Sequence, residues 1–589
     1  MTPAFSPALA ADLAVPAAPV YAPPTAFDTP VLIVGAGPVG LALAGDLGWR
    51  GIPCILVEKS DGAISQPKMD MVGVRSMEFC RRWGIVPWVE GSPYPRDYPQ
   101  DNVWVSSMTG WEFGREVMPG LADEPCPAES PQKRERCPQD MFDPILTRFA
   151  RSFSHVQVRY STELLSFAQD AQGVTVQLQS QPATNDGKAL PQTLRAQYLV
   201  GCDGGASLVR QSLGIAMQGQ PVLTYTTNVI FRCPQFTALH DKGRAYRFII
   251  IGEQGTWVTI VAINGRDRWR FSIVGSDSKR TYTEAEVREA IVRAMGQAFD
   301  FEILSMMHWV RRELVADRYG EGRVQLAGDA VHLTSPTGGF GMNTGIQDAV
   351  GLSWALEACL RGWGGAGLLQ AYELERRPVA LRNVREASGN LSRMLSPRVR
   401  NPGKAIFAPG PEGDAARAAF GQEYTAMMKR EWYTNGIHLG YRYEGSPVIV
   451  PDGTPEPPDA VSDYVQTARP GHRAPHVWLA PGRSTLDLFG RGFVLLCLGT
   501  TPDSASPALQ DLRAAATACG LPLTVIDLDQ PEVLRAYVNR LVMVRPDGHV
   551  AWRGDNAPQG AAASALIDRV RGVLEVTEVT EVVEVPGAA

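Results

Sequence analysis

Three glycines could bind a phosphate group. Gly35, Gly37 and Gly40 follow the short apolar run PVLIV and open a segment with a helical pattern. In such a turn the first glycine allows a tight bend, the second lets a phosphate approach the backbone, and the third lets helix and strand pack closely. The helix N-terminus then offers free N–H groups and a partial positive charge to a pyrophosphate. Glu58, followed by Lys59, ends the next apolar run. A carboxylate at this place can accept a hydrogen bond from a ribose hydroxyl. The spacing predicts a dinucleotide site.

Two aspartates follow other predicted strands. Asp203 ends the apolar stretch YLVGCD, where it could equally cap the helix that follows. Asp329 comes after the buried run 323–327, and the carboxyl ends of strands border the crevice in which α/β sheets bind ligands. The loop PTGGFGMN at 336–343 then runs into a helix. Its backbone N–H groups can stabilise a developing negative charge.

These three motifs, in this order and spacing, resemble one family. They are similar to the single-component (class A) FAD-dependent aromatic hydroxylases with the para-hydroxybenzoate hydroxylase fold. The resemblance covers about 30–380. The stretch GHRAPHVW, followed by STLDL, looks like the start of the thioredoxin-like C-terminal domain of the phenol hydroxylase and 2-hydroxybiphenyl monooxygenase branch. No CxxC pair accompanies it.

The resemblance implies FAD as cofactor and NADPH or NADH as co-substrate. Lys68 stands where the family often has Arg, so it keeps the charge and loses the planar fork. Pro336 would line the place where flavin ring and substrate meet. The residues expected to hold FAD are Gly35, Gly37, Gly40, Glu58, Lys59, Lys68, Gln139, Asp203, Asp329, Pro336, Gly339, Gly341, Met342 and Asn343.

The same resemblance points to Asp70 as a catalytic residue. In this branch the position can carry an Asp that faces the substrate hydroxyl, and a carboxylate there could take the phenolic proton. The alternative is a loop Asp that binds nearby backbone N–H groups. Tyr246 and Arg247, from a β-rich segment, are the candidate partners of Asp70. Arg232 and Trp257 are weaker candidates.

The implied reaction is hydroxylation of a phenolic aromatic ring by NAD(P)H and O2, through a flavin C4a-hydroperoxide. A Baeyer-Villiger or epoxidising monooxygenase of the same fold, acting on a polyketide-like substrate, is the first alternative. A non-catalytic flavin-binding interaction protein is the alternative of another class. His332, close to Asp329, is expected to be structural, and the histidines show no metal-binding spacing.

The elements that must position these residues form an α/β protein. We expect an FAD-binding Rossmann-like domain with an inserted β-rich substrate domain and a C-terminal thioredoxin-like domain. The runs at 155–200 suggest antiparallel strands, and 136–153 reads as a helix. The expected order is a disordered leader (1–27), the FAD-binding domain (28–220, with an excursion at about 91–135), the substrate domain (221–305), the rest of the FAD-binding domain (306–400), a linker (401–465) and the C-terminal domain (466–589).

Composition excludes several other classes. The 589 residues carry 56 Lys and Arg against 62 Asp and Glu, a net charge of −6, which argues against a nucleic-acid binder. No apolar run approaches the ~20 residues of a membrane span. Nine cysteines in so long a chain give no disulfide framework, so a cytoplasmic location is expected. The expected partners are a small phenolic substrate and O2, with a homodimer allowed.

Overall fold

The first sheet is built around β1 (Thr29–Val34), the apolar run before the glycine turn. The computed structural model describes residues 18–180, 191–396, 402–499 and 507–573. All six residues of β1 are buried, which is why the run is continuous and does not alternate. The strand order is β16 (Gly320–Glu321), β17 (Val324–Leu326), β10 (Gln192–Gly201), β1, β2 (Cys54–Val57) and β7 (Val156–Arg159), with β9 (Val174–Ser180) on β10 and β8 (Thr162–Gln169) on β9.

The parallel strands of this sheet bring their carboxyl ends together. β1 pairs in parallel with β2 and β10, and β10 pairs in parallel with β17. The turns after β1, β10 and β17 therefore meet at one edge, where open sheets bind ligands. The helices of this part of the chain are α2 (Pro38–Trp49), α3 (Val74–Arg82), α4 (Val86–Glu90), α5 (Gln139–Arg151), α6 (Leu208–Ser212), α8 (Phe340–Arg361) and α9 (Gly367–Met394).

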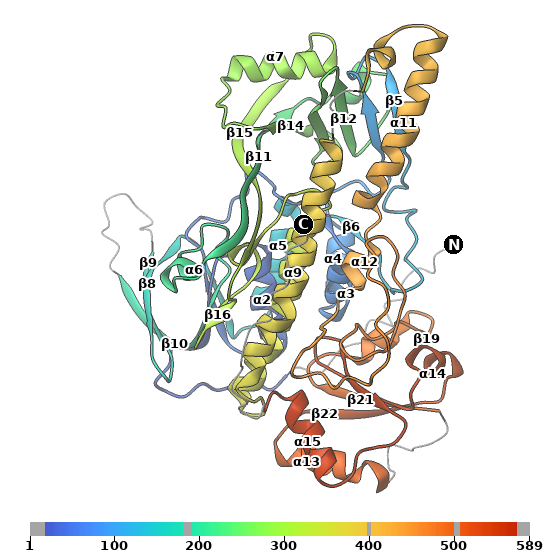
Figure 1. Ribbon diagram of the computed structural model, residues 1–589. Coiled ribbons are helices and arrows are strands. Elements are labelled where there is room, and N and C mark those ends of the chain that lie inside the picture. Colours follow the sequence, from blue (N-terminus) through green and yellow to red (C-terminus); the bar gives the residue numbers. More distant parts are fainter. Residues whose placement is uncertain (1–17, 181–190, 397–401, 500–506, 574–589) are drawn as a thin grey trace.

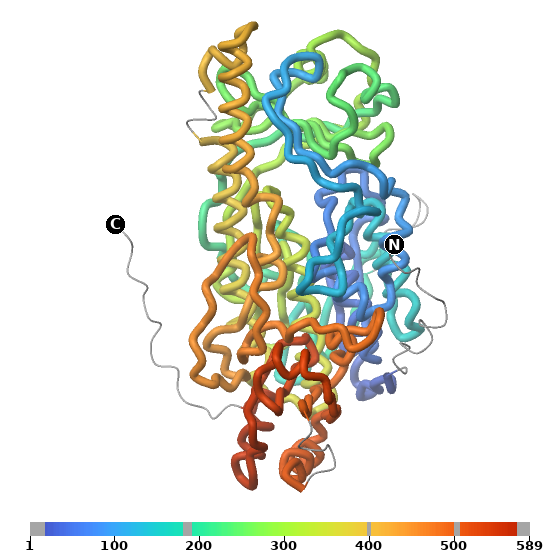
Figure 2. Tube along the Cα trace, turned by 90° about the vertical axis from the view of Figure 1, so that its right-hand side faces the viewer, coloured from blue at the N-terminus to red at the C-terminus, as the bar shows by residue number. Residues whose placement is uncertain are grey.

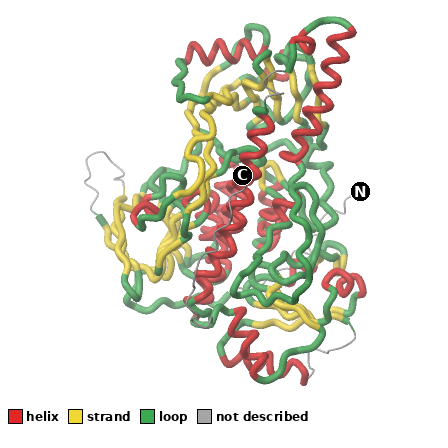
Figure 3. Tube along the Cα trace, in the orientation of Figure 1, coloured by secondary structure: helices red, strands yellow, loops and turns green. Residues whose placement is uncertain are grey.

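A second large sheet stands above this edge (Figures 1 and 3). It is mostly antiparallel, and one of its faces is covered by α7 (Glu284–Met295). The other face is covered by α11 (Pro411–Trp432) and the end of α9. The strand order is β18 (His332–Leu333), β15 (Glu302–Ala316), β11 (Met217–Arg232), β14 (Arg268–Ser276), β13 (Gly255–Ala262), β12 (Arg247–Gly252), β4 (Asn102–Val105) and β5 (Glu112–Glu116).

The C-terminal domain lies at the end of the molecule away from the second sheet (Figures 1 and 2). In its four-stranded sheet β21 is parallel to β22 and antiparallel to β23. The elements are β19 (Trp478–Ala480), β20 (Arg483–Ser484), β21 (Phe493–Leu498), α13 (Gln510–Ala518), β22 (Leu523–Leu528), α14 (Pro531–Tyr537), β23 (Leu541–Val544), β24 (Val550–Gly554) and α15 (Ala561–Val570). The predicted α/β fold class is confirmed.

Several sequence-based expectations differ from the structure in detail. Of the strands expected at 155–200 to be antiparallel, β7 pairs in parallel with β2, and β10 pairs in parallel with β1 as well as antiparallel with β9. The excursion at 91–135 supplies β4 and β5 to the second sheet, since β4 pairs with β12. The expected linker at 401–465 contains the long helix α11 and the short α12 (Asn435–Leu439). The expected helix at 136–153 begins at Gln139, after the short strand β6 (Glu135–Arg136), which pairs with β3 (Met71–Val72).

The ends of the chain are only partly described. Residues 1–17 of the expected leader and the acidic tail from 574 lie outside the described residues. Residues 18–27 are described, and there Tyr21 donates its backbone N–H to the carbonyl of Gly51. Among the described helices, none is both long enough and apolar enough to cross a membrane.

A buried ion network joins α3 to the C-terminal domain. Glu78, 6% exposed, accepts hydrogen bonds from Arg75 (2.7 Å), from Arg473 Nε (3.0 Å) and from the Ser130 hydroxyl (2.6 Å). Burial alone would raise the pKa of Glu78, but Arg473 and Arg75 lower that pKa to about 2. The carboxylate therefore stays charged and depends on a partner from the C-terminal domain. Arg81 adds a second link, to Asp487 at 2.7 Å.

We predict that Arg473→Met destabilises the whole protein. The substitution leaves Glu78 buried beside Arg75 with half of its compensating charge, which typically costs about 3–5 kcal/mol. Chemical denaturation of the purified protein measures this loss. Arg535→Met is the matched control, because Arg535 is 73% exposed in its pair with Glu532, and we expect no measurable change there. Equal effects of the two substitutions would contradict the prediction.

Candidate active site

The glycine turn has the geometry of a phosphate cradle. Gly35 has a φ of +104°, and a Cβ there would lie 2.4 Å from the carbonyl oxygen of Cys202. A Cβ on Gly40 would lie 1.9 Å from the carbonyl oxygen of Gly35, so both positions need glycine for packing. A Cβ on Gly37 would meet no atom within 4 Å. Gly37 is also the N-cap of α2, so it faces open space at a positively polarised helix end. A pyrophosphate fits there.

Glu58 lies beside this turn at the carboxyl end of β2. One of its carboxylate oxygens accepts the backbone N–H of Ala36 at 2.9 Å. The other accepts the backbone N–H and the hydroxyl of Ser60 at 2.9 and 2.8 Å. These bonds fix the carboxylate beside the glycine turn with acceptor capacity to spare. Lys59 is exposed.

Asp203 and Asp329 border the same crevice from β10 and β17. Asp203 accepts the backbone N–H of Val209 at 3.1 Å with Oδ2, whereas its Oδ1 is enclosed and has no hydrogen-bond partner. Such an atom is expected to be hydrogen-bonded, so it is suited to a ligand donor. Asp329 is exposed although its neighbours Gly328 and Ala330 are buried. Its carboxylate is free to accept hydroxyl groups of a polyol.

The glycine-rich loop 336–343, which we call the flavin loop, enters α8 through residues in the left-handed region. Gly338 and Gly339 have φ values of +91° and +68°. Asn343 fixes the loop against β3, because its Nδ2 donates to the carbonyls of Gly339 (2.8 Å) and Met71 (3.2 Å). Its Oδ1 accepts the backbone N–H of Gly73 at 2.7 Å. Pro336 is exposed, and Gly341 and Met342 are half-buried.

Lys68 and Gln139 are joined through the backbone. Gln139, the first residue of α5, accepts the N–H of Lys68 at 3.0 Å and donates to Asp143 at 3.1 Å. Burial raises the pKa of Asp143 to about 7, which favours a neutral or half-ionised carboxyl there at neutral pH. The Lys68 side chain is exposed. Both residues are placed next to β3 and stay predicted FAD contacts.

Asp70 is a carboxylate held by contacts from the short strand β6 and from the second sheet. Arg136 donates to its Oδ1 at 2.7 Å, while the Tyr246 hydroxyl and Arg270 donate to its Oδ2 at 2.7 and 3.2 Å. Burial would raise the pKa of Asp70, but the two arginines and the tyrosine hold that pKa below its ordinary value. Asp70 is therefore ionised at neutral pH. Arg136 also stacks on the Tyr246 ring, with its guanidinium carbon 3.5 Å from the ring centre.

The structure brings Tyr246 to Asp70 and takes Arg247 elsewhere. Arg247 donates to Glu431 of α11 and to Asn102 of β4, both at 2.9 Å. The expected pairing of Arg247 with Asp70 is thus replaced by a pairing with α11, whose position over the sheet the sequence did not reveal. Arg270 takes the place beside Asp70. The polar alternation of RWRFSIV could have suggested Arg270, since it shares a face with Ser272.

The two weaker candidates and His332 lie away from Asp70. Arg232 is half exposed near Asp267 and Glu302, and Trp257 lies under Arg293. His332 is fully buried and binds Asp348 at 2.8 Å, and Asp348 also binds Arg376 at 2.8 Å. His332 therefore has a structural environment. Within the described ranges, no group of three or more His, Cys, Asp or Glu side chains is arranged to hold a metal.

Comparison with known proteins decides the family. Residues 28–387 match the FAD binding domain, and residues 467–574 match the C-terminal domain of aromatic-ring hydroxylases. The chain belongs to the FAD-dependent aromatic-ring hydroxylases. This hydroxylase is thus a flavoprotein monooxygenase that uses FAD, as the sequence predicted.

Relatives of this hydroxylase match it along nearly the whole chain. The 4-methyl-5-nitrocatechol 5-monooxygenase of Burkholderia sp is 31% identical, with 94% of this chain and 99% of the relative covered. A putative polyketide hydroxylase of Streptomyces halstedii is 33% identical over 90% of this chain and 94% of the relative. The solved structure of RebC with bound 7-carboxy-K252c has a TM-score of 0.84 and 36% identity, covering 95% of this chain and 100% of RebC.

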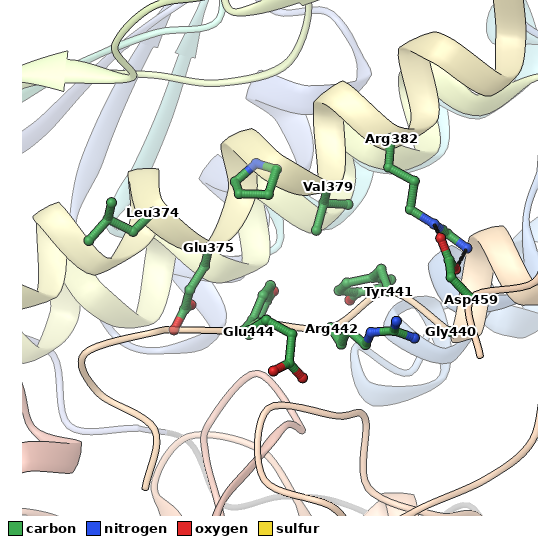
Figure 4. Close-up of a pocket in the computed structure, with 11 residues that line it drawn as sticks. Leu374, Glu375, Val379, Arg382, Gly440, Tyr441, Arg442, Glu444 and Asp459 are labelled. Carbon is green, nitrogen blue, oxygen red and sulfur yellow. Dashed lines mark hydrogen bonds and ion pairs between the residues drawn. The ribbon is translucent and has the colours of Figure 1, made fainter. Parts of the chain in front are cut away.

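A separate pocket of about 170 Å³ lies between α9 and the segment 440–444 (Figure 4). None of its lining residues belongs to the crevice or to the Asp70 cluster. Its charged side chains already have partners. Arg382 pairs with Asp459, Glu375 with Arg545, and Glu444 with Arg469. This pocket therefore offers no unpaired charge to a ligand.

We predict that Gly37→Ala weakens FAD retention without harming the fold. The added methyl group meets no protein atom, but it would stand where the predicted pyrophosphate site needs space. Gly35→Ala is the contrasting variant, because its Cβ would clash with Cys202 and its φ is positive. We expect Gly37→Ala to raise the FAD dissociation constant at least about tenfold, ~1.4 kcal/mol, at an unchanged melting temperature of the apoprotein. Gly35→Ala should lower that melting temperature. Tight FAD binding by Gly37→Ala would contradict the assignment.

Proposed function

We propose that this hydroxylase uses NAD(P)H and O2 to hydroxylate a phenolic ring that lies between Asp70 and the flavin loop. One observation carries the proposal: the residue directly after Asp70, Met71, contacts the flavin loop. The carbonyl of Met71 accepts Asn343 Nδ2, and Asp70 itself binds Tyr246 next to the second sheet. The Asp70 carboxylate therefore lies next to both the flavin loop and the second sheet. A phenol placed there can donate its hydroxyl to Asp70 while its ring faces the flavin.

Each group of residues along the crevice would bind a different part of FAD. The glycine turn would bind its pyrophosphate, Glu58 its adenosine ribose and Asp329 its ribityl hydroxyls. The N-terminal N–H groups of α8 would face its pyrimidine edge, where the helix dipole favours negative charge. When bound, FAD supplies the transfer of electrons from NAD(P)H and the activation of O2.

Asp70 would increase the electron density of the phenol. A carboxylate has about four lone-pair positions, and Arg136, Arg270 and Tyr246 occupy three of them here. The remaining position can accept the phenolic O–H. Because its pKa is held low, Asp70 binds the proton weakly in the resting complex. We therefore place the transfer of the proton toward Asp70 in the step in which the ring carbon attacks oxygen.

The proposed reaction has a direct test. The FAD-loaded enzyme is supplied with NADPH or NADH and a panel of phenols and polycyclic hydroxyaromatics under 18O2, while NAD(P)H consumption, product and hydrogen peroxide are measured together. We expect at least one phenol to accelerate NAD(P)H consumption and to gain one 18O as a ring hydroxyl. A product with oxygen inserted next to a ketone, or consumption that no aromatic compound stimulates, would contradict the proposal.

We predict that Asp70→Asn slows hydroxylation by about 10²-fold or more while flavin reduction changes less, because the amide cannot take the phenolic proton. Rapid-mixing measurements separate the two half-reactions. Asp97→Asn is the control, since Asp97 is 71% exposed and pairs with Arg244. Hydroxylation by Asp70→Asn at the parent rate would exclude this role for Asp70.

The proposal needs only the phenol, NAD(P)H and O2 as partners. The homodimer and the cytoplasmic compartment expected from the sequence stay predictions. Light scattering of the purified protein would test the homodimer.

A further inference from the structure

The two faces of the second sheet differ in polarity. One face packs apolar side chains such as Phe248 and Phe271 under α7. Because side chains alternate along a strand, the residues between them turn to the opposite face, which α11 and the end of α9 cover. The centre of that face is polar, and it carries Thr224, Thr226, Asn228, Arg270, Ser272 and Arg311. Arg270 already binds Asp70, so this face borders the proposed phenol site.

Arg311 is a buried cation whose hydrogen bonds, within the described residues, go to neutral groups. It is 6% exposed. Its Nε donates to the Thr226 hydroxyl at 3.1 Å, and its Nη1 donates to the Ser335 hydroxyl at 3.4 Å. A guanidinium has five N–H donors, so three are left for a ligand. Burial lowers the pKa of Arg311 to about 10; the Glu431 carboxylate opposes this shift, whereas Arg247 and Arg270 add to it, and the group is still charged at neutral pH.

The region around Arg311 has more positive than negative charge. Two buried arginines, Arg136 and Arg311, and two that are 13% and 18% exposed, Arg247 and Arg270, lie here with two carboxylates, Asp70 and Glu431. Asp70 pairs with two of the arginines, and Glu431 pairs with Arg247. Of these four arginines, Arg311 alone has no carboxylate within ion-pair distance among the described residues. Burying a charge without a partner is costly, so the arrangement favours an anionic ligand.

We propose that the substrate of this hydroxylase is an aromatic acid and that Arg311 binds its carboxylate. The inference rests on the function proposed above. Ser335, which accepts from Arg311, directly precedes Pro336 of the flavin loop, and Asp70 reaches the same loop through Met71. Asp70 and Arg311 are thus both linked to the flavin loop, and in the proposal Asp70 binds the phenolic hydroxyl while Arg311 binds the acid. A planar carboxylate matches the guanidinium because it can accept two parallel hydrogen bonds.

The native enzyme gives the first test. The probes are 3-hydroxybenzoate, 3-hydroxy-2-naphthoate and 1,4-dihydroxy-2-naphthoate, each beside its methyl ester, and binding is followed by the change in the flavin absorbance spectrum. We expect the acid of at least one pair to bind about tenfold more tightly than its ester, ~1.4 kcal/mol. If no acid binds more tightly than its ester, the proposal is overturned, whatever the variants show.

Substitutions then assign the preference to Arg311. We expect Arg311→Gln to remove the preference for the acid while the affinity for the ester stays within about twofold, and Arg311→Lys to keep part of the preference. Arg312→Gln is the matched control, because it removes the same charge from the next residue of β15, whose side chain lies on the other face. FAD content and melting temperature are measured on all variants. If Arg311→Gln fails to retain FAD, Arg311→Lys and the native pairs still decide.

Two other outcomes would also overturn the proposal. One is an acid preference that survives in Arg311→Gln. The other is a shift in the flavin reduction potential of Arg311→Gln at an unchanged acid preference, which would mean that Arg311 serves the flavin. A failure of the proposed function looks different, because NAD(P)H consumption would then respond to no phenol, neutral or acidic.

Discussion

Asp70 is a largely enclosed carboxylate, 13% exposed, whose charge is balanced by groups from two separate parts of the molecule. Arg136 comes from the short strand β6 beside the first sheet, and Arg270 comes from the second sheet. A buried charge with partners on two elements fixes the separation of those elements, since moving either one leaves the charge unpaired. The second sheet is thereby held at a set distance from the flavin loop. The height of any substrate pocket between them follows from this constraint.

The C-terminal domain supports the same constraint from the opposite side. β3, which begins directly after Asp70, is followed by α3, and α3 carries Glu78 into the ion network with Arg473. The C-terminal domain therefore stabilises the segment that carries Asp70 through the contact between Arg473 and Glu78. The C-terminal domain lacks a CxxC pair, and its charged side chains give it a structural role, because they stabilise the neighbouring domain.

The sequence predicted the parts of the site that are local in the chain. The turn at Gly35–Gly40, with Glu58 at the next strand end, needs only a strand, a turn and a helix in succession, so its motif is readable. The Asp70 cluster is different, because Arg270 is 200 residues away from it along the chain. Its place there depends on which alternate residues of β14 lie on the same face of the second sheet as the Asp70 contact, and a shift of one residue reverses the face.

The misassignment of Arg247 has the same origin. Tyr246 and Arg247 are neighbours in sequence, yet one binds Asp70 and the other binds Glu431. The partner of Arg247 lies on α11, in a segment whose many Pro and Gly residues suggested a linker. The parallel pairing of β12 with β4, which also places Asn102 beside Arg247, joins segments about 145 residues apart in the chain. Local alternation cannot reveal such a pairing.

The central claim is that Asp70 receives the hydroxyl of the substrate in front of the flavin loop. A crystal structure of the enzyme with FAD and a bound phenol tests it most directly. The account predicts that the phenolic oxygen lies within hydrogen-bond distance of an Asp70 carboxylate oxygen, with the ring between the second sheet and the flavin. A phenol bound with its hydroxyl away from Asp70, and Asp70 still enclosed by Arg136, Arg270 and Tyr246, would contradict it.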